Sequence, residues 1–209
     1  TLGLAATPWA WATASAATSA TTATASNTPP LVIVGAPGLA WSDLERDDLP
    51  ALTALVEQGA SGSLTVRAVR SRSCAIDGWL TLSAGRRAGD LPGPCREPLP
   101  PVGGLVPYWS DYLAAAAADS YDARPGLLAE AVAASGACLQ SSGAGAAIGA
   151  ADPDGSVGST YSDTVPTSVE CPVVLVDGGA LPVTQPERAD AVARLDALVA
   201  QVVGAAPGA

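Results

Sequence analysis

The chain has 209 residues, of which 48% are hydrophobic, so it is long enough to bury one core of ordinary size. Its 20 acidic residues outnumber the 10 basic residues, and the net charge of −10 disfavours nucleic acid and anionic lipid headgroups as partners. The sequence contains no histidine, so it lacks the imidazole ligand that zinc sites commonly use.

Residues 1–30 differ in composition from the rest of the chain. Residues 1–26 are rich in Ala and Thr and carry no charge. This composition resembles the apolar part and small-residue tail of a secretory signal, with an A-x-A-like cleavage site at residues 23–25. A low-complexity linker is the alternative. We expect an exported, extracytoplasmic protein, secreted or anchored at the cell surface, whose folded domain spans residues 31–209.

Membrane association is expected only through segments outside that folded domain. After residue 30, no run of about 18 residues is apolar and free of charge, so the sequence predicts no spanning helix there.

The amino half of the folded part predicts alternating strands and helices. Residues 31–36, LVIVGA, form a continuous apolar run, as expected for a strand buried on both faces of a parallel sheet. Residues 49–59 have apolar positions at helical spacing, with Pro near the start and Gly at the end. Residues 63–69 alternate as a second strand, and residues 79–84 predict a short helix. Residues 91–107 are rich in proline and predict an ordered surface loop that Cys95 fastens.

The carboxyl half repeats this alternation. The predicted helices are residues 108–118, 127–135 and 186–203, the predicted strands are residues 144–150 and 172–177, and a turn is predicted at residues 152–155. Together the elements predict a three-layer α/β/α fold with a mostly parallel sheet. Functional residues of such sheets gather at the carboxyl ends of the strands, where Ala36, Cys74 and Asp177 would meet.

The four cysteines are Cys74, Cys95, Cys138 and Cys171, and they permit three pairings. None has the C-x-x-C spacing of a zinc or redox site, and two disulfides are the simplest interpretation. Pairing of sequence neighbours would join Cys74 to Cys95 and Cys138 to Cys171. A buried free thiol and a reactive nucleophile are the alternatives for Cys74.

Five arginines are concentrated in a short stretch: Arg67, Arg70, Arg72, Arg86 and Arg87. Solvated charge is the simpler interpretation of this group, and local attraction of an anion is the alternative.

Four segments carry a resemblance to a known family. They are LVIVGAPGL at residues 31–39, SCAIDGWLTLSAG at residues 73–85, VVLVDGGALP at residues 173–182 and RLDALVAQVV at residues 194–203. In order and spacing they resemble the amino-terminal part of the alkaline phosphatase superfamily. The likeness is to the type I phosphodiesterase and nucleotide pyrophosphatase branch, and within it to actinobacterial exported or membrane-associated proteins.

The resemblance implies roles for individual residues. Cys74 takes the position of the nucleophile, and Asp177 matches an aspartate that binds metal. Ala36 stands where the family has a second metal-binding aspartate, and no histidine follows Asp177. The resemblance also implies an alkaline-phosphatase-like sheet that this chain completes only in part, with an exposed edge strand.

Purely structural interpretations are alternatives to these roles. Asp77 and Asp177 each precede a glycine, as turn or capping residues often do. The glycines of residues 143–149 lack the Lys and Ser or Thr of a phosphate-binding loop, so we interpret them as packing positions.

Three functional hypotheses follow. The first is an exported phosphatase-like domain that has lost catalysis, needs no cofactor and serves as a binding or scaffold module for an unknown cell-envelope component. The second is a zinc- or manganese-dependent hydrolase of phosphoric or sulfuric esters whose metal site is completed by residues beyond Ala209. The third is an unrelated α/β domain.

Overall fold

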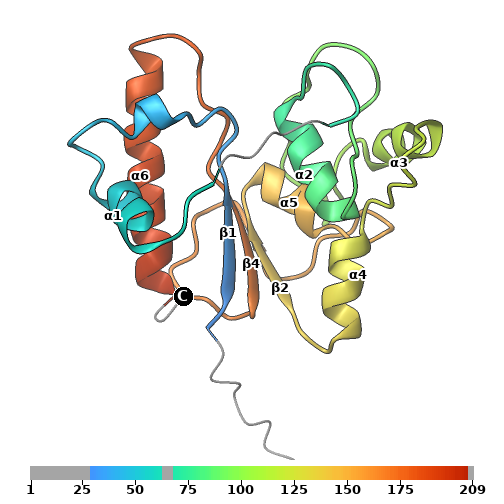
Figure 1. Ribbon diagram of the computed structural model, residues 1–209. Helices are drawn as coiled ribbons and strands as arrows, with labels where there is room; N and C mark the ends of the chain where they lie inside the picture. Colours follow the sequence, from blue (N-terminus) through green and yellow to red (C-terminus); the bar gives the residue numbers. More distant parts are fainter. Residues whose placement is uncertain (1–28, 63–67, 207–209) are drawn as a thin grey trace, which may run out of the picture.

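A sheet of parallel strands lies at the centre of the molecule (Figure 1). The computed structural model describes residues 29–62 and 68–206. Within these residues the strand order is β1-β4-β2-β3, all pairs are parallel, and six α-helices flank the sheet. The strands are β1 (Leu31–Gly35), β2 (Leu139–Ser142), β3 (Tyr161–Ser162) and β4 (Val173–Asp177). The helices are α1 (Pro50–Gln58), α2 (Ala75–Ala84), α3 (Trp109–Ala118), α4 (Leu127–Ala134), α5 (Ala144–Ala150) and α6 (Glu187–Ala205), with the 3-10 helix η1 (Trp41–Asp43).

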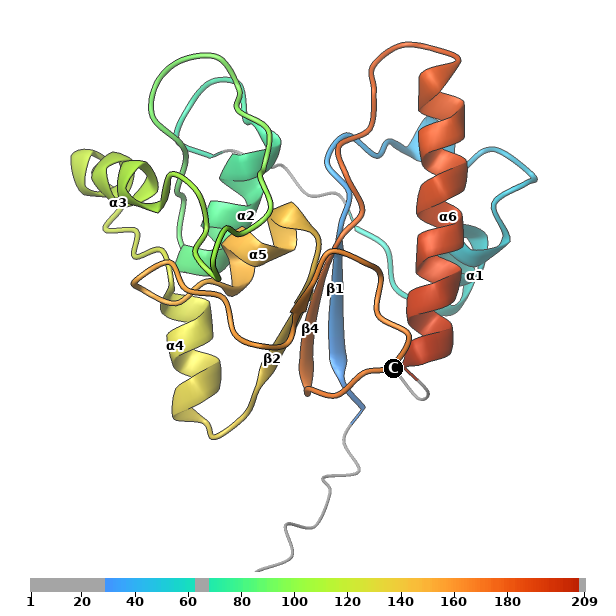
Figure 2. The same ribbon diagram turned by 180° about the vertical axis from the view of Figure 1, so that it is seen from behind.

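Helices cover both faces of the sheet, as Figures 1 and 2 show from opposite sides. Successive side chains of a strand point to opposite faces, which divides the apolar residues of β4 between two cores. Val174 and Val176 pack with Val202 of α6, whereas Leu175 packs with α2 and α5. The helices therefore form two layers around the sheet, α1 and α6 on one face and α2 to α5 on the other.

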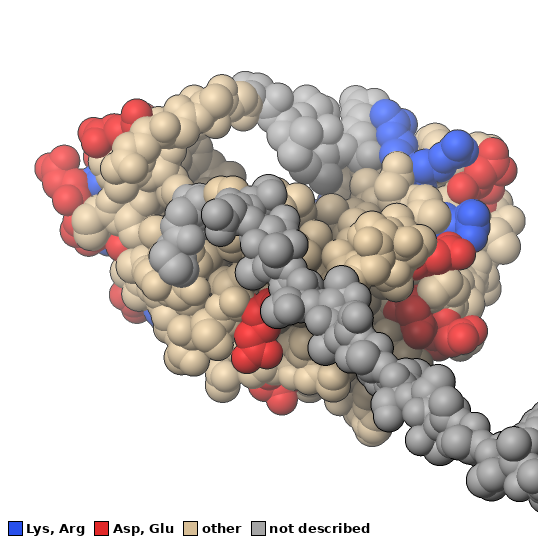
Figure 3. Space-filling view, turned by 90° about the horizontal axis from the view of Figure 1, so that it is seen from below, with Lys and Arg blue, Asp and Glu red and all other residues tan. Residues whose placement is uncertain are grey.

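Acidic side chains are spread over the surface (Figure 3). In this view from below, arginine side chains gather mainly at the end of the molecule that carries α2, α3 and α4, next to acidic groups. The negative charge of the chain is therefore not concentrated in a single patch on this face.

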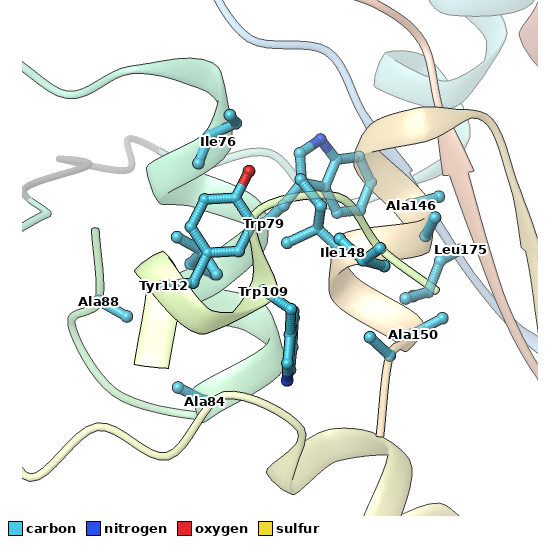
Figure 4. Close-up of a cluster of buried hydrophobic side chains, with 14 residues drawn as sticks. Ile76, Trp79, Ala84, Ala88, Trp109, Tyr112, Ala146, Ile148, Ala150 and Leu175 are labelled. Carbon is cyan, nitrogen blue, oxygen red and sulfur yellow. The ribbon is translucent and has the colours of Figure 1, made fainter. Parts of the chain in front are cut away.

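The core beneath α2 is built around Trp79, which is 4% exposed (Figure 4). Three glycines make room for its indole. A Cβ atom built at Gly35 of β1 would lie 2.5 Å from Cζ2 of Trp79, and one at Gly149 would lie 3.1 Å from its Cε3. At Gly145 a Cβ would lie 2.1 Å from Nε1. The indole thus lies where β1 and α5 approach closely, and the glycines of α5 are packing positions, as the sequence indicated.

A partly buried ion pair joins α6, in the opposite layer, to the turn after β1. Arg188 at the start of α6 donates to Asp43 of η1 through Nε at 2.8 Å and through Nη2 at 2.6 Å. The same guanidinium donates to the carbonyl oxygens of Pro182 at 2.7 Å and Gly38 at 2.8 Å. Arg188 therefore fixes the first turn of α6 against the segments that follow β1 and β4.

Most of the predicted elements are present. The strands expected at residues 31–36 and 172–177 are β1 and β4, and the helix expected at residues 49–59 is α1. Three further predicted helices, at residues 108–118, 127–135 and 186–203, are α3, α4 and α6 with small shifts of their ends. The predicted turn at residues 152–155 is closed by a bond from the N–H of Gly155 to the carbonyl of Asp152 at 2.9 Å.

The prediction of a strand at residues 144–150 was wrong. Residues 144–150 form helix α5, because Asp177 accepts the N–H of Gly145 in its first turn and the helix packs into the core around Trp79. The strand is β2, immediately before it, and the two-residue β3 was not anticipated. The helix expected at residues 79–84 begins earlier, at Ala75.

Several expectations fall on residues that are not described. The leader expected at residues 1–30 lies almost wholly outside the described residues, and so does most of the strand expected at residues 63–69. Ala68 and Val69, which are described, are not in a strand. Among the described strands β1 pairs only with β4, so it forms one edge of the sheet, and its Leu31 is 58% exposed.

Candidate functional site

The carboxyl ends of the strands lie beside the start of α2, where a functional site was expected. Ala36 and Cys74 line one cavity of about 510 Å³ at this edge. Asp177 does not line the cavity, but it lies at the same edge of the sheet, as the register partner of Gly35 beside Ala36. The other lining residues come from the end of β1, the turn after it and the first two turns of α2, and they are Ile33, Gly35, Pro37, Gly38, Ser73, Ala75, Gly78, Trp79 and Leu82.

This cavity, which we call the apolar cavity, contains no carboxylate or imidazole among its lining residues. Ala36 contributes only a methyl group to it. Zinc and similar cations are held mainly by carboxylate, imidazole or thiolate ligands, and the side chains of this lining supply none of these. Its chemistry fits an apolar group better than a cation.

Cys74 lies immediately before α2 and is joined to Cys95, with an S–S distance of 2.02 Å and Cα atoms 5.5 Å apart. The second disulfide joins Cys138 to Cys171. Both pairs are those of sequence neighbours, and the described residues contain no free cysteine. The sulfur of Cys74 is therefore not a thiol in this structure. A disulfide sulfur carries no negative charge and cannot act as the nucleophile that a thiolate would be.

Asp77 is fully buried and organises the backbone around Cys74. Its Oδ2 accepts the N–H of Cys74 at 2.8 Å, which caps the first turn of α2. Its Oδ1 accepts the N–H of Asp90 at 3.0 Å and pairs with Nη2 of Arg70 at 3.3 Å. This carboxylate therefore has a structural role, in agreement with its capping interpretation, and it ties α2 to two loops.

Asp177, the candidate metal ligand, is occupied by hydrogen bonds at the end of β4. Its Oδ2 accepts the N–H of Gly145 at 2.7 Å, in the first turn of α5, and its Oδ1 accepts the N–H of Gly179 at 2.9 Å. A carboxylate at a helix N-terminus is stabilised by the unpaired amides there. Across residues 29–62 and 68–206, no group of three or more His, Cys, Asp or Glu side chains is placed to hold a metal ion.

A second cavity, of about 450 Å³, also has Cys74 in its lining. Residues 70–72, Cys74 and residues 93–95 line it, and we call it the arginine cavity. Arg70 and Arg72 of the sequence group meet here. Arg86 instead pairs with Asp122 at 3.7 Å and Arg87 lies over the ring of Tyr121, while Arg67 lies outside the described residues.

The loop that closes the arginine cavity is held by a separate cluster around Arg96. This guanidinium pairs with Asp90 and with Asp111 at 2.8 Å, and it lies 4.4 Å from the centre of the Tyr108 ring. Hydrogen bonding to Asp90 raises the pKa of Arg96, and burial raises the pKa of Tyr112 beside it to about 12. Arg96 therefore remains charged and anchors the proline-rich loop. The sequence did not indicate this anchor, because its acidic partners lie on other segments.

The fold and these cavities define an α/β protein with an all-parallel four-strand sheet and two disulfides. The two disulfides indicate an oxidising, extracytoplasmic environment. The chain matches no family model, no curated protein and no solved structure. In the part of the chain that the structure describes, none of the helices is long and apolar enough to cross a bilayer.

Proposed function

We propose that the chain is an exported domain of phosphatase-like ancestry that has lost catalysis and serves as a binding or scaffold module in the cell envelope. The observation that carries this proposal is the bond between Cys74 and Cys95. Cys74 stands in the position of the family's nucleophile, and in a disulfide it has no thiolate to attack phosphorus. The parallel sheet with helices on both faces is compatible with that ancestry, including an alkaline-phosphatase-like sheet completed only in part.

The surroundings of Cys74 support the same proposal. The cavity beside it has the methyl group of Ala36 and no acidic lining residue. Asp177, the other candidate ligand, accepts two backbone N–H groups. The sequence contains no histidine to act as a general base or a zinc ligand. In this proposal no cofactor is required, and the partner is a cell-envelope component.

The competing function is hydrolysis of phosphoric or sulfuric esters with zinc or manganese. It is favoured by the order and spacing of the four family-like segments. In that case Asp177 would have to exchange its two amide donors for a cation, and further ligands would have to come from outside the described residues. Membrane attachment, in either case, would occur through segments outside the folded domain.

A hydrolysis assay tests the proposal. The oxidised protein is incubated with bis(p-nitrophenyl) phosphate and with zinc or manganese, and bound metal is counted after gel filtration. We expect no turnover above the level of a Cys74→Ala/Cys95→Ala variant and no stoichiometric metal. Turnover that this variant abolishes, together with about one or more metal ions per chain, would establish the hydrolase instead.

A further inference from the structure

We propose that the arginine cavity binds an oxyanion, the terminal phosphate, sulfate or carboxylate group of a larger ligand. The inference rests on the proposed function, because it names the ligand chemistry of the binding module. The cavity is a separate place from the apolar cavity, since the two share only Cys74 in their linings. It contains two arginines and no acidic lining residue.

Arg70 is held in a fixed position with donor capacity to spare. Its Nη1 donates to the carbonyl of Gly93 at 3.2 Å, and its Nη2 pairs with Asp77 at 3.3 Å. Its Nε is buried and has no hydrogen-bond partner among the described residues. A buried donor without an acceptor is costly, and an arginine carries five N–H donors. An oxyanion in the cavity would supply acceptors to a guanidinium that is already oriented.

Arg72 supplies the uncompensated charge. The carboxylate of Asp77 offsets Arg70, but within residues 29–62 and 68–206 no acidic side chain forms an ion pair with Arg72, which is exposed. By contrast, Arg46, Arg96 and Arg188 each have an acidic partner within 3 Å. In a chain of net charge −10, an unpaired arginine beside a second one is a local positive site.

The disulfide sets the geometry of this site. It joins Cys74, next to the two arginines, to Cys95, which also lines the cavity. Arg96, the next residue, is fixed by Asp90 and Asp111, so the wall is held on both sides of the bond. Guanidinium groups bind oxyanions best when their fork is preorganised, because less side-chain entropy is then lost. The bond that removes the Cys74 thiol therefore builds the wall of an anion site.

An NMR titration tests this inference. Protein labelled with nitrogen-15 is titrated with sodium phosphate, sodium sulfate or sodium acetate, with chloride adjusted to hold ionic strength constant, and the arginine Nε–H resonances are followed. We expect saturable shifts at Arg70 and Arg72 with at least one of these anions. Saturation with acetate alone would specify a carboxylate ligand, and saturation with phosphate or sulfate a tetrahedral one.

Two variants and a matched control sharpen the result. Arg72→Gln removes one charged donor, and Ser71→Asp places a carboxylate on the exposed cavity wall; each is expected to weaken binding about tenfold. Arg194→Gln removes an exposed arginine of α6 that has no ion pair among the described residues, and it should leave binding unchanged.

Chemical shifts that grow linearly without saturation, or that are equal at Arg194 and Arg72, would show nonspecific ionic effects in place of binding. Either result would overturn the inference. The hydrolysis assay is independent of this result. Turnover would refute the loss of catalysis without touching the titration, whereas a failed titration would leave the absence of turnover intact.

Discussion

The side chains around Cys74 are engaged by partners within the chain. Cys74 is bonded to Cys95, Asp177 caps α5, and Asp77 joins α2 to the loops at Arg70 and Asp90. Each side chain is of a type that can perform catalysis or bind metal, but each is engaged by a partner of the chain itself. At the scale of single residues, these side chains form a network that fixes the backbone around the start of α2 and α5.

The Asp77 carboxylate is expected to be essential for stability. Asp77→Asn leaves Arg70 without its ion pair and turns an amide donor toward the N–H of either Cys74 or Asp90, so we predict a loss of about 3 kcal/mol in the free energy of unfolding. Urea denaturation measures this loss. The exposed Asp154→Asn is the control and should change stability by less than about 0.5 kcal/mol. Equal midpoints for the two variants would contradict the role assigned to Asp77.

The glycines around Trp79 give a second prediction at this scale. A methyl group at Gly145 would lie 2.1 Å from Nε1 of Trp79 and 2.6 Å from Oδ2 of Asp177, so Gly145→Ala should destabilise the fold by about 3 kcal/mol. Gly78→Ala is the matched control in α2, where a Cβ has no neighbour within 4 Å. Because Ala favours the helix by about 0.8 kcal/mol, Gly78→Ala should stabilise slightly. Thermal unfolding of both variants tests this, and a Gly145→Ala variant as stable as the Gly78→Ala control would contradict the packing argument.

At the scale of elements, the central strands and the long helices could be predicted, but the assignment around β2 could not. The runs of β1 and β4 are apolar and β-branched, and α6 shows a clear helical stripe. The sequence of β2, LQSS, is polar. A buried strand can hold Ser142 because its hydroxyl donates to the carbonyl of Thr164 at 2.8 Å. That acceptor lies on a distant segment, so no local pattern reveals the strand. The short apolar run of α5 then resembles the missing strand.

The ion pair between Asp43 of η1 and Arg188 of α6 predicts that the stability of the fold depends on pH. The hydrogen bond from Arg188 is the main cause that lowers the pKa of Asp43 below its usual 3.8. The folded protein therefore keeps this carboxylate charged to lower pH than the unfolded chain does. Its stabilisation is complete above about pH 4 and is lost as the pH falls through the lowered pKa of the folded state.

Asp43→Asn removes that pair and is expected to cost about 2 kcal/mol at neutral pH, with a smaller loss at pH 2. Urea denaturation at both pH values measures the difference. The exposed Asp47→Asn serves as the control. A cost for Asp43→Asn that is the same at both pH values would contradict the assignment.

The disulfides fasten opposite ends of the sheet. Cys74–Cys95 lies at the carboxyl ends of the strands and spans 21 positions, whereas Cys138–Cys171 precedes β2 and β4 and spans 33. From the loop lengths, replacing either pair by serines should cost about 3 to 4 kcal/mol. Chemical denaturation of the two double variants checks this estimate. A variant as stable as the wild type would show that its bond does not restrain the unfolded chain.

At the scale of the whole molecule, the parallel sheet, its two helical layers and the two disulfides describe an extracytoplasmic α/β domain. The sequence predicted this architecture from alternating strands and helices, and it indicated the disulfide pairs from their spacing. The predicted Cys74–Cys95 bond brings residues 70–72 near residues 93–95. The sequence could not predict that these segments enclose a cavity, because that also depends on the Arg96 cluster and on the hydrogen bond from Arg70 to Gly93. The proposed loss of catalysis and the anion site both depend on the Cys74–Cys95 bond.

The oxidation state of Cys74 is therefore the most direct measurement. The native protein is alkylated without reduction, digested and mapped by mass spectrometry. We expect the peptide that contains Cys74 to be linked to the peptide that contains Cys95, with no alkylated cysteine. An alkylated Cys74, or a link from Cys74 to Cys138 or Cys171, would contradict the account.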